Sequence, residues 1–134
     1  MSPLSIIETN FVDSNFIDFY NDWHADIKAF FPDFSEKSIE TDNIYLLEYA
    51  GIIAGLLVYV KQGKKLIVKV DYMIPEFRDM GIGPLFFNKK IEHFREDGIK
   101  KIETSTFHPD HKNYLLEIGF KPVKNSEGLF EMKF

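Results

Sequence analysis

The sequence has no cysteine, and it has no apolar run that approaches the ~20 residues of a membrane-spanning helix. The absence of cysteine excludes disulfide bonds, thiolate nucleophiles and cysteine-ligated metal sites. The first nine residues also lack the basic region and apolar core of a secretory signal. From these absences we expect a cytoplasmic protein that does not associate with membranes.

Positive charge is scarce as well. Sixteen Lys and Arg residues stand against 21 Asp and Glu residues, which gives a formal net charge of −5. Non-specific binding to nucleic acid needs a basic surface, so we expect no nucleic-acid partner. An acidic surface suits an amine-bearing substrate better, although a charge of this size is also what solubility alone requires.

Hydrophobic residues, in contrast, are abundant. They make up 45% of the 134 residues, and 14 of them are Phe. A chain of this length and composition can bury one sizeable core, and no linker, repeat or low-complexity segment divides it. We therefore predict a single domain over residues 1–134, and leave open whether it forms a homodimer.

Apolar residues at helical spacing predict three helices, at residues 14–31, 84–97 and 108–118. Asp13 and Ser14 are N-cap candidates for the first helix, which ends before Pro32. Its apolar stripe consists of Phe16, Ile17, Tyr20, Trp23, His24, Ile27, Phe30 and Phe31. Such a stripe usually faces the core. The alternative is that Trp23, His24 or Phe30 lines a substrate pocket.

The remaining apolar segments have the composition and period of strands. They are residues 4–8, 44–49, 52–60, 65–74, 101–107, 120–124 and 129–134. Short turn signals join the second, third and fourth of them, which predicts an antiparallel meander. Residues 35–43 fit either a short helix or an irregular link. The element order predicts an α/β fold of the α+β kind, with one mixed, mostly antiparallel sheet of about six to seven strands and helices on both faces.

The most informative stretch is residues 68–94, where a predicted strand ends at Pro75 and a helix begins at Pro84. The loop between them contains Arg78, Gly81 and Gly83. A glycine-bearing turn at a helix N-terminus gathers unpaired backbone N–H groups and the positive end of the helix dipole. This pattern predicts a phosphate-binding site.

Two common phosphate-binding loops fit this stretch poorly. A Walker loop requires Gly-Lys-Ser/Thr, which does not follow. A dinucleotide-binding loop requires a small residue where Phe86 stands and a parallel strand order upstream. Glu103, twenty residues after Gly83, is nevertheless placed as a ribose-binding acid would be. A dinucleotide-binding domain therefore stays as an alternative that NAD(H) binding would test.

The hexapeptide Arg78-Asp79-Met80-Gly81-Ile82-Gly83 carries a third interpretation. It follows Ile74-Pro75-Glu76-Phe77, and the later predicted helix ends in Ile118-Gly119-Phe120. Together with the element order from about residue 44 onward, this pattern resembles the GNAT superfamily of acyl-CoA-dependent N-acyltransferases. The resemblance implies a GNAT fold and an N-acetyltransferase. Such an enzyme would transfer the acetyl group of acetyl-CoA to an amine of a small molecule or protein, by direct attack in a ternary complex and without a metal.

The resemblance also implies which residues bind coenzyme A. The pyrophosphate would lie on the amides of Arg78, Asp79, Met80, Gly81, Ile82 and Gly83, where the two glycines remove Cβ atoms. The backbone of Met73 and Ile74 would bind the pantetheine arm in a gap between the strands at 65–74 and 101–107. His108 would lie near that arm. Asp79 departs from the pattern because it puts a negative charge next to the proposed phosphate site, so its side chain must point to solvent or hydrogen-bond the loop itself.

The catalytic groups match the family less closely. Many GNAT members have Asn eleven residues and Tyr four residues before the glycine of the last helix, whereas this chain has His108 and Leu115. Tyr114 lies one residue before Leu115 and therefore about 100° away from it around the helix. It acts as the acid only if the start or register of this helix differs from that of the family. For the base, Asp71 is the first candidate, because apolar neighbours raise a carboxyl pKa.

Alternatives to these assignments remain. Asp71 is equally consistent with a structural role, and Glu103 or Glu48 could act as base through water. His108 and His111 lie three residues apart, but a metal site needs further ligands that the sequence does not supply, so we predict none. His111 is a candidate proton shuttle. Helix capping and surface exposure of the two histidines are the alternative.

Two functions therefore remain in competition. The first is the N-acetyltransferase. The second is a catalytically inactive GNAT-like module that binds acyl-CoA or a partner without turnover, which the displaced tyrosine favours. The sequence does not identify the acceptor.

Overall fold

The computed structural model describes residues 3–35, 43–78 and 81–134. Asp79, Met80 and most of the undecided segment 35–43 lie outside the described residues. The elements, in chain order, are β1 (Leu4–Thr9), α1 (Ser14–Phe30), β2 (Asn43–Tyr49), β3 (Ile52–Gln62), β4 (Lys65–Met73), η2 (Pro75–Phe77), α2 (Ile82–Glu96), β5 (Lys101–Ser105), α3 (Pro109–Glu117), β6 (Lys121–Pro122) and β7 (Leu129–Lys133). Every predicted helix and strand is present.

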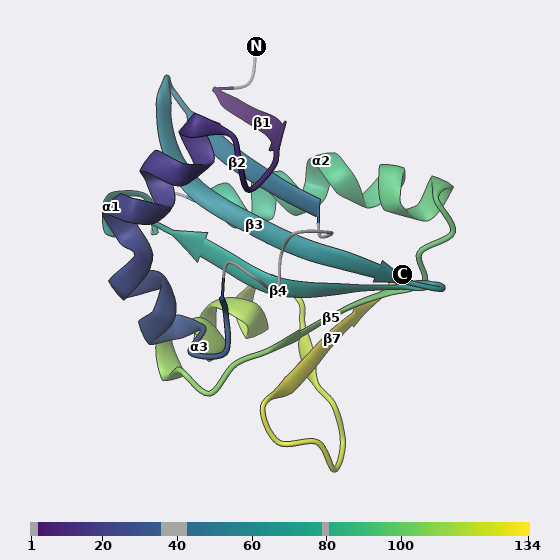
Figure 1. Cartoon of the computed structure of the whole chain (residues 1–134). Coiled ribbons are helices and arrows are strands. Elements are labelled where there is room, and N and C mark those ends of the chain that lie inside the picture. Colours follow the sequence, from purple (N-terminus) through teal and green to yellow (C-terminus); the bar gives the residue numbers. More distant parts are fainter. Residues whose placement is uncertain (1–2, 36–42, 79–80) are drawn as a thin grey trace.

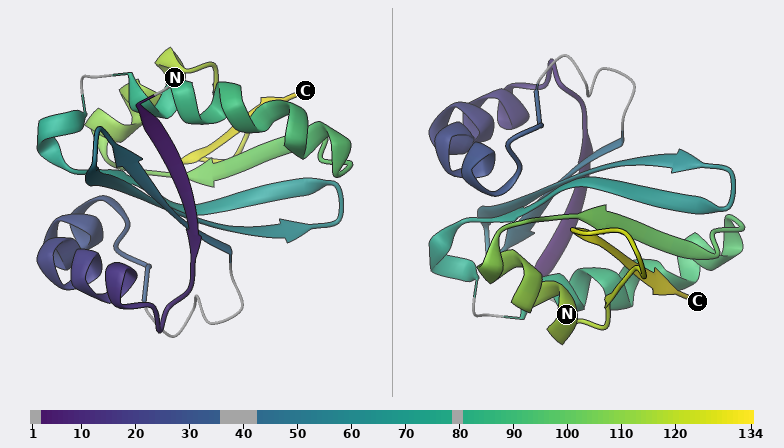
Figure 2. Two further views of the ribbon diagram at one scale, coloured as in Figure 1. Left: turned by 90° about the horizontal axis from the view of Figure 1, so that it is seen from above. Right: turned by 90° about the horizontal axis from the view of Figure 1, so that it is seen from below.

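The seven described strands form one sheet in the order β1-β2-β3-β4-β5-β7-β6. Neighbouring strands are antiparallel except for β4 and β5, which are parallel and are joined through α2. Helix α1 covers one face of the sheet, and α2 and α3 cover the other (Figures 1 and 2). The predicted mixed sheet with helices on both faces is confirmed.

Helix boundaries follow local chemistry. Asp13 caps α1, and its side chain accepts a hydrogen bond of 2.9 Å from the N–H of Asn15. Helix α2 begins two residues before the predicted Pro84, which its first turn tolerates because no N–H is needed there. It ends before Gly98, whose φ of +83° closes the helix. None of the helices in the described ranges has the length and apolar character to cross a membrane.

The apolar stripe of α1 is predicted correctly in part. Phe16, Tyr20 and Ile27 are buried as expected, and Phe19, which the prediction leaves out, is buried beside them. Ile17 and His24 are exposed, so their placement in the core-facing stripe is wrong. The predicted stripe is rotated slightly around the helix axis. The buried face of α1 includes Phe19, whereas the spacing of the bulky residues indicates a face that includes Ile17 and His24.

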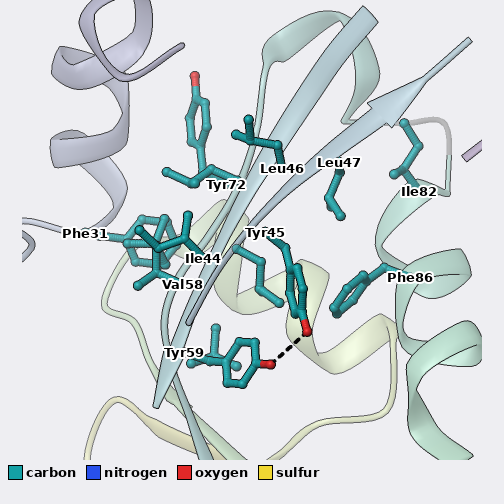
Figure 3. Close-up of a cluster of buried hydrophobic side chains, with 14 of the residues drawn as sticks. Phe31, Ile44, Tyr45, Leu46, Leu47, Val58, Tyr59, Tyr72, Ile82 and Phe86 are labelled. Atoms are coloured by element: carbon teal, nitrogen blue, oxygen red, sulfur yellow. Dashed lines mark hydrogen bonds between the residues drawn. The ribbon is translucent and has the colours of Figure 1, made fainter. Parts of the chain in front are cut away.

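On the opposite face, side chains of β2 pack against α2. Tyr45 and Leu47 point toward Phe86 and Ile82 (Figure 3). The Tyr59 hydroxyl donates a hydrogen bond of 3.1 Å to the Tyr45 hydroxyl, so these polar groups are paired within the core. This layer fixes the first turn of α2 against the sheet.

Candidate active site

The strands β4 and β5 separate halfway along β4. They pair only from Lys65 to Val68 on β4, opposite residues 101–104. Just beyond this pairing, the register between β3 and β4 shifts by one residue, so that β4 bulges at Lys69. From the bulge onward β4 continues toward η2, while β5 runs toward α3 (Figure 1). A gap therefore opens in the middle of the sheet.

The register of β3 and β4 decides which backbone groups face this gap. The Ile74 N–H donates to the Ala54 carbonyl at 2.8 Å, and the Ile74 carbonyl accepts from Phe77 at 3.0 Å. Because bonding alternates along an antiparallel pair, Met73 and Asp71 direct their N–H and C=O groups to the other side. Of the two residues predicted to bind a pantetheine arm, Met73 faces the gap, whereas the backbone of Ile74 bonds within the protein.

The N-terminus of α2 lies at the end of this gap. Gly81 is the N-cap with φ of +69° and has no side chain to cap the helix. Leu85 donates to the Gly81 carbonyl at 3.3 Å, and Pro84 has no N–H. The N–H groups of Ile82 and Gly83 therefore lack intrahelical acceptors, and the first turn has no acidic side chain. These features suit an anion.

A cavity of about 110 Å³ connects the gap with this helix end. It brings together all three predicted catalytic residues, namely Asp71 from β4 and His111 and Tyr114 from α3. Gly83 also lines it. Leu115, which occupies the position where the family resemblance expects a tyrosine, is fully buried in the core. Tyr114 reaches the cavity in its place.

The Tyr114 hydroxyl packs directly on Gly83. A Cβ at Gly83 would overlap the hydroxyl oxygen and lie 2.6 Å from the ring Cζ, so only glycine leaves room for the ring. The hydroxyl is buried and has no hydrogen-bond partner among the described residues. Burial raises its pKa well above the ordinary tyrosine value, and the Asp71 carboxylate raises it further. Tyr114 therefore stays protonated and can act only as a proton donor near neutral pH.

The pKa of Asp71 is also raised, but here the consequence is different. Burial raises the pKa of its carboxyl to about 7, as the sequence predicts from its apolar neighbours. Such a carboxyl can accept a proton near neutral pH. The alternative bases are less suitable. Glu103 accepts from Lys101 at 2.9 Å and from Lys65 at 3.4 Å, which lowers its pKa, and Glu48 does not line this cavity.

The two histidines of α3 have different environments. His111 is buried beside Phe31, with ring centroids 5.1 Å apart, so the alternative that it lies exposed on the surface is wrong. Burial lowers its pKa to about 4, and the ring is neutral at pH 7. The Nδ1 of His108 accepts from the Asp110 N–H at 3.2 Å, so the alternative of helix capping holds for this residue. Its ring stacks on Phe30 at 4.1 Å.

The side chain of Arg78 is held by contacts with β4 and α1. Its Nη2 lies 2.6 Å from Oδ2 of Asp26 on α1, and its Nε donates to the Met73 carbonyl at 2.9 Å. Tyr72 donates to the same Asp26 oxygen at 2.5 Å, and the guanidinium lies 4.8 Å from the Phe30 ring centroid. Partial burial favours a raised Asp26 pKa, but these hydrogen bonds outweigh it and lower the pKa. The network ties α1 to the edge of the gap.

We expect Asp26→Asn to weaken this network. The loss of the charged acceptor for Arg78 and Tyr72 should lower the free energy of unfolding by about 1 kcal/mol, because both partners are partly exposed. Urea unfolding measures this change. Asp22→Asn, at an exposed acid of the same helix, is the matched control. Equal stability of the two variants would show that the network does not contribute.

No family model matches the sequence, and no curated protein matches it. Solved structures do match along the whole chain. A GNAT-family acetyltransferase from Elizabethkingia anophelis with acetyl-CoA bound has a TM-score of 0.70 at 17% identity, with 100% of each chain covered. The PaiA N-acetyltransferase from Thermoplasma acidophilum in complex with coenzyme A has a TM-score of 0.73 at 15% identity, again with 100% of each chain covered.

A third structure is more similar in shape. It is an acetyl transferase from Salmonella typhimurium that modifies the N-terminal serine of a 50S ribosomal subunit protein. Its TM-score is 0.77 at 10% identity, with 100% of this chain and 96% of that chain covered. The fold is therefore that of the GNAT-family acetyltransferases, and the resemblance seen in the sequence is confirmed at the level of the fold.

Proposed function

We propose that the protein transfers an acetyl group from acetyl-CoA to an amine, by direct attack in a ternary complex. One observation carries the proposal. The edge of β4 beyond its pairing with β5 opens onto the N-terminus of α2, where Gly81 has no side chain to cap the helix, and the cavity between them is lined by a carboxyl of raised pKa and a protonated tyrosine. The complexes of similarly folded proteins with coenzyme A and acetyl-CoA support the same choice of cosubstrate.

The binding assignment follows from the donors. The N–H groups of Ile82 and Gly83 would bind the pyrophosphate, with the helix dipole contributing about 0.3–1 kcal/mol per charge contact. The N–H of Met73 faces the gap and would bind the pantetheine arm or the thioester carbonyl. Asp79 and Met80 remain predicted members of the same loop.

The proton transfers can be assigned to two side chains. The amine attacks the thioester carbonyl and gives its proton to the Asp71 carboxylate, while the Tyr114 hydroxyl gives its proton to the departing thiolate. The Asp71 carboxyl then returns a proton to the Tyr114 oxygen, because the two groups border the same cavity. Neutral His111 could relay a proton between them but, with its low pKa, it does not supply one.

The assay for this proposal is the release of free coenzyme A. We expect a thiol reagent to detect coenzyme A when the protein is incubated with acetyl-CoA and a suitable amine from a panel. The inactive binding module remains the second candidate, and the burial of Leu115 at the family's tyrosine position favours it. Saturable coenzyme A binding without turnover on any amine would support this second candidate and contradict the first.

Gly81 provides a sharper test of the binding assignment. Gly81→Asp places a negative charge at the N-cap beside the proposed pyrophosphate, so we expect coenzyme A to bind at least 10-fold more weakly than to Gly81→Asn. The Asn variant is the matched control, since both side chains tolerate the left-handed conformation at φ of +69° and differ in charge. Equal affinities in calorimetry would place the pyrophosphate elsewhere.

A further inference from the structure

A second and larger cavity lies beside the first. It has a volume of about 610 Å³ and runs between the end of α1 and the paired ends of β4 and β5. Most of its lining is apolar, and the bulky apolar members are Phe30, Phe31, Phe34, Ile67, Phe107 and Leu129. We call this cavity the aromatic groove. Its size lies within the range of about 300–1,000 Å³ that is typical of small-molecule sites.

Several polar groups of the groove already have partners inside the protein. The Thr104 hydroxyl donates to the Val68 carbonyl at 3.1 Å, and the Thr106 hydroxyl accepts from the His108 N–H at 3.2 Å. Glu103 is held in ion pairs with Lys65 and Lys101. Asp33 and Lys69 also belong to the lining. Specific recognition of a highly polar ligand would require more polar groups that are aimed into the groove.

Part of the groove's backbone is also occupied. Strand β5 pairs with β4 along one edge over residues 101–104, and with β7 along the other edge over residues 101–105. An extended peptide that binds beside a sheet is held mainly by main-chain hydrogen bonds to a free strand edge. Over its paired residues 101–104, β5 offers no such edge, so contacts with a ligand there come chiefly from apolar side chains. This argues against a peptide and for a compact apolar ligand.

Phe107 marks the outer end of the groove. This residue is 77% exposed, and one part of its ring rests on Gly128, where a Cβ would lie 2.5 Å from a ring carbon. A ring so exposed contributes little to the core. A ligand that covers it would gain apolar contact area at about 25 cal/mol per Å².

Phe30 links the two cavities. Its ring lines both of them and stacks on His108 at 4.1 Å. A ligand with its apolar body in the aromatic groove would therefore point its other end past these two rings. Asp71 and Tyr114 line the first cavity, which Phe30 shares with the groove. This juxtaposition suits a molecule with an apolar body at one end and an amine at the other.

We propose that the aromatic groove is the acceptor site, and that the acceptor is a small primary amine with an aromatic or branched aliphatic body. Peptide N-termini and polyamines would be poor acceptors, because the described residues of the groove offer neither a free strand edge over residues 101–104 of β5 nor a cluster of acidic groups. The inference rests on the proposed acetyl transfer, since that reaction supplies the reason for an amine.

Three acceptors distinguish the classes: phenethylamine, spermidine and a short peptide with a free N-terminal serine. We expect kcat/KM for phenethylamine to exceed the other two values by at least 10-fold. Phe107→Ala should raise the KM for phenethylamine about 10-fold and leave the KM for acetyl-CoA unchanged. Leu116→Ala is the matched control, since Leu116 is exposed on α3 and lines neither cavity. A preference for spermidine or the peptide would overturn the inference while leaving acetyl transfer intact.

A binding measurement separates the two proposals if no turnover is found. Calorimetry with phenethylamine and the wild-type protein saturated with coenzyme A should show saturable binding that Phe107→Ala weakens about 10-fold. Such a result without turnover would support the groove assignment and contradict the proposed reaction. Absence of phenethylamine binding would overturn the groove assignment, whether or not another amine is acetylated.

Discussion

Gly83→Ala is expected to lower the free energy of unfolding by about 2 kcal/mol and to weaken coenzyme A binding at least 10-fold. The new Cβ would overlap the Tyr114 oxygen and lie 2.6 Å from its Cζ, so the ring must move. Overpacking of this kind usually costs about 1–3 kcal/mol, which exceeds the gain of up to ~1 kcal/mol from replacing a helical glycine by alanine. The displaced ring would also enter the cavity proposed for coenzyme A.

A double-mutant cycle with Tyr114→Ala tests this explanation. In the Tyr114→Ala background the clash is absent, so Gly83→Ala should be neutral or slightly stabilising in urea unfolding. The difference between the two backgrounds measures the contact between the ring and the helix end. The same destabilisation in both backgrounds would show that Gly83 is needed for another reason.

Asp71→Asn is expected to raise stability above pH 7 and to lower turnover sharply. The folded protein holds the pKa of Asp71 at about 7, against an ordinary value of 3.8. The full shift corresponds to about 4 kcal/mol, but the residue is half-buried and its carboxyl borders a cavity that water can enter, so we expect about 2 kcal/mol.

The sign of this effect follows from proton binding. Between pH 3.8 and about 7 the folded state holds the Asp71 proton more tightly than the unfolded state, so the contribution of Asp71 to stability falls as pH rises. An asparagine side chain cannot ionise and has no such loss. The stability difference between the Asp71→Asn variant and the wild type should therefore grow from pH 5 to pH 8. Urea unfolding at several pH values measures it, with the exposed Asp33→Asn as control.

The kinetic consequence is independent of the stability change. If Asp71 is the base, wild-type kcat/KM for the amine should rise as pH passes about 7, and Asp71→Asn should lower kcat at least 100-fold with coenzyme A affinity unchanged. A structural role would not produce this pH dependence. Unaltered turnover in the Asn variant across the pH range would remove Asp71 from the mechanism.

The sequence predicts the elements of this fold because their signals are local. The N-cap at Asp13, the glycine after α2 and the alternation along β4 each depend on a few neighbouring residues. The loop with Gly81 and Gly83 is likewise recognisable without tertiary information. These features are sufficient to predict the sheet, its helices and the phosphate-binding pattern.

The catalytic arrangement depends on contacts that no local pattern reveals. Asp26 and Arg78 are 52 positions apart and meet only because α1 crosses the end of β4. Tyr114 reaches the cavity because Gly83 of another helix leaves space for its ring. The burial of His111 depends on Phe31, which comes from the opposite face of the sheet. Charge and side-chain type alone could not predict these pairings.

The central claim is that the gap between β4 and β5 is the acyl-CoA site. A crystal structure of the protein with coenzyme A tests it most directly. We predict the pyrophosphate on the N–H groups of Ile82 and Gly83, and the pantetheine arm along β4 beside Met73, with its sulfur near Tyr114. Coenzyme A bound at another surface, with the gap left empty, would contradict the account.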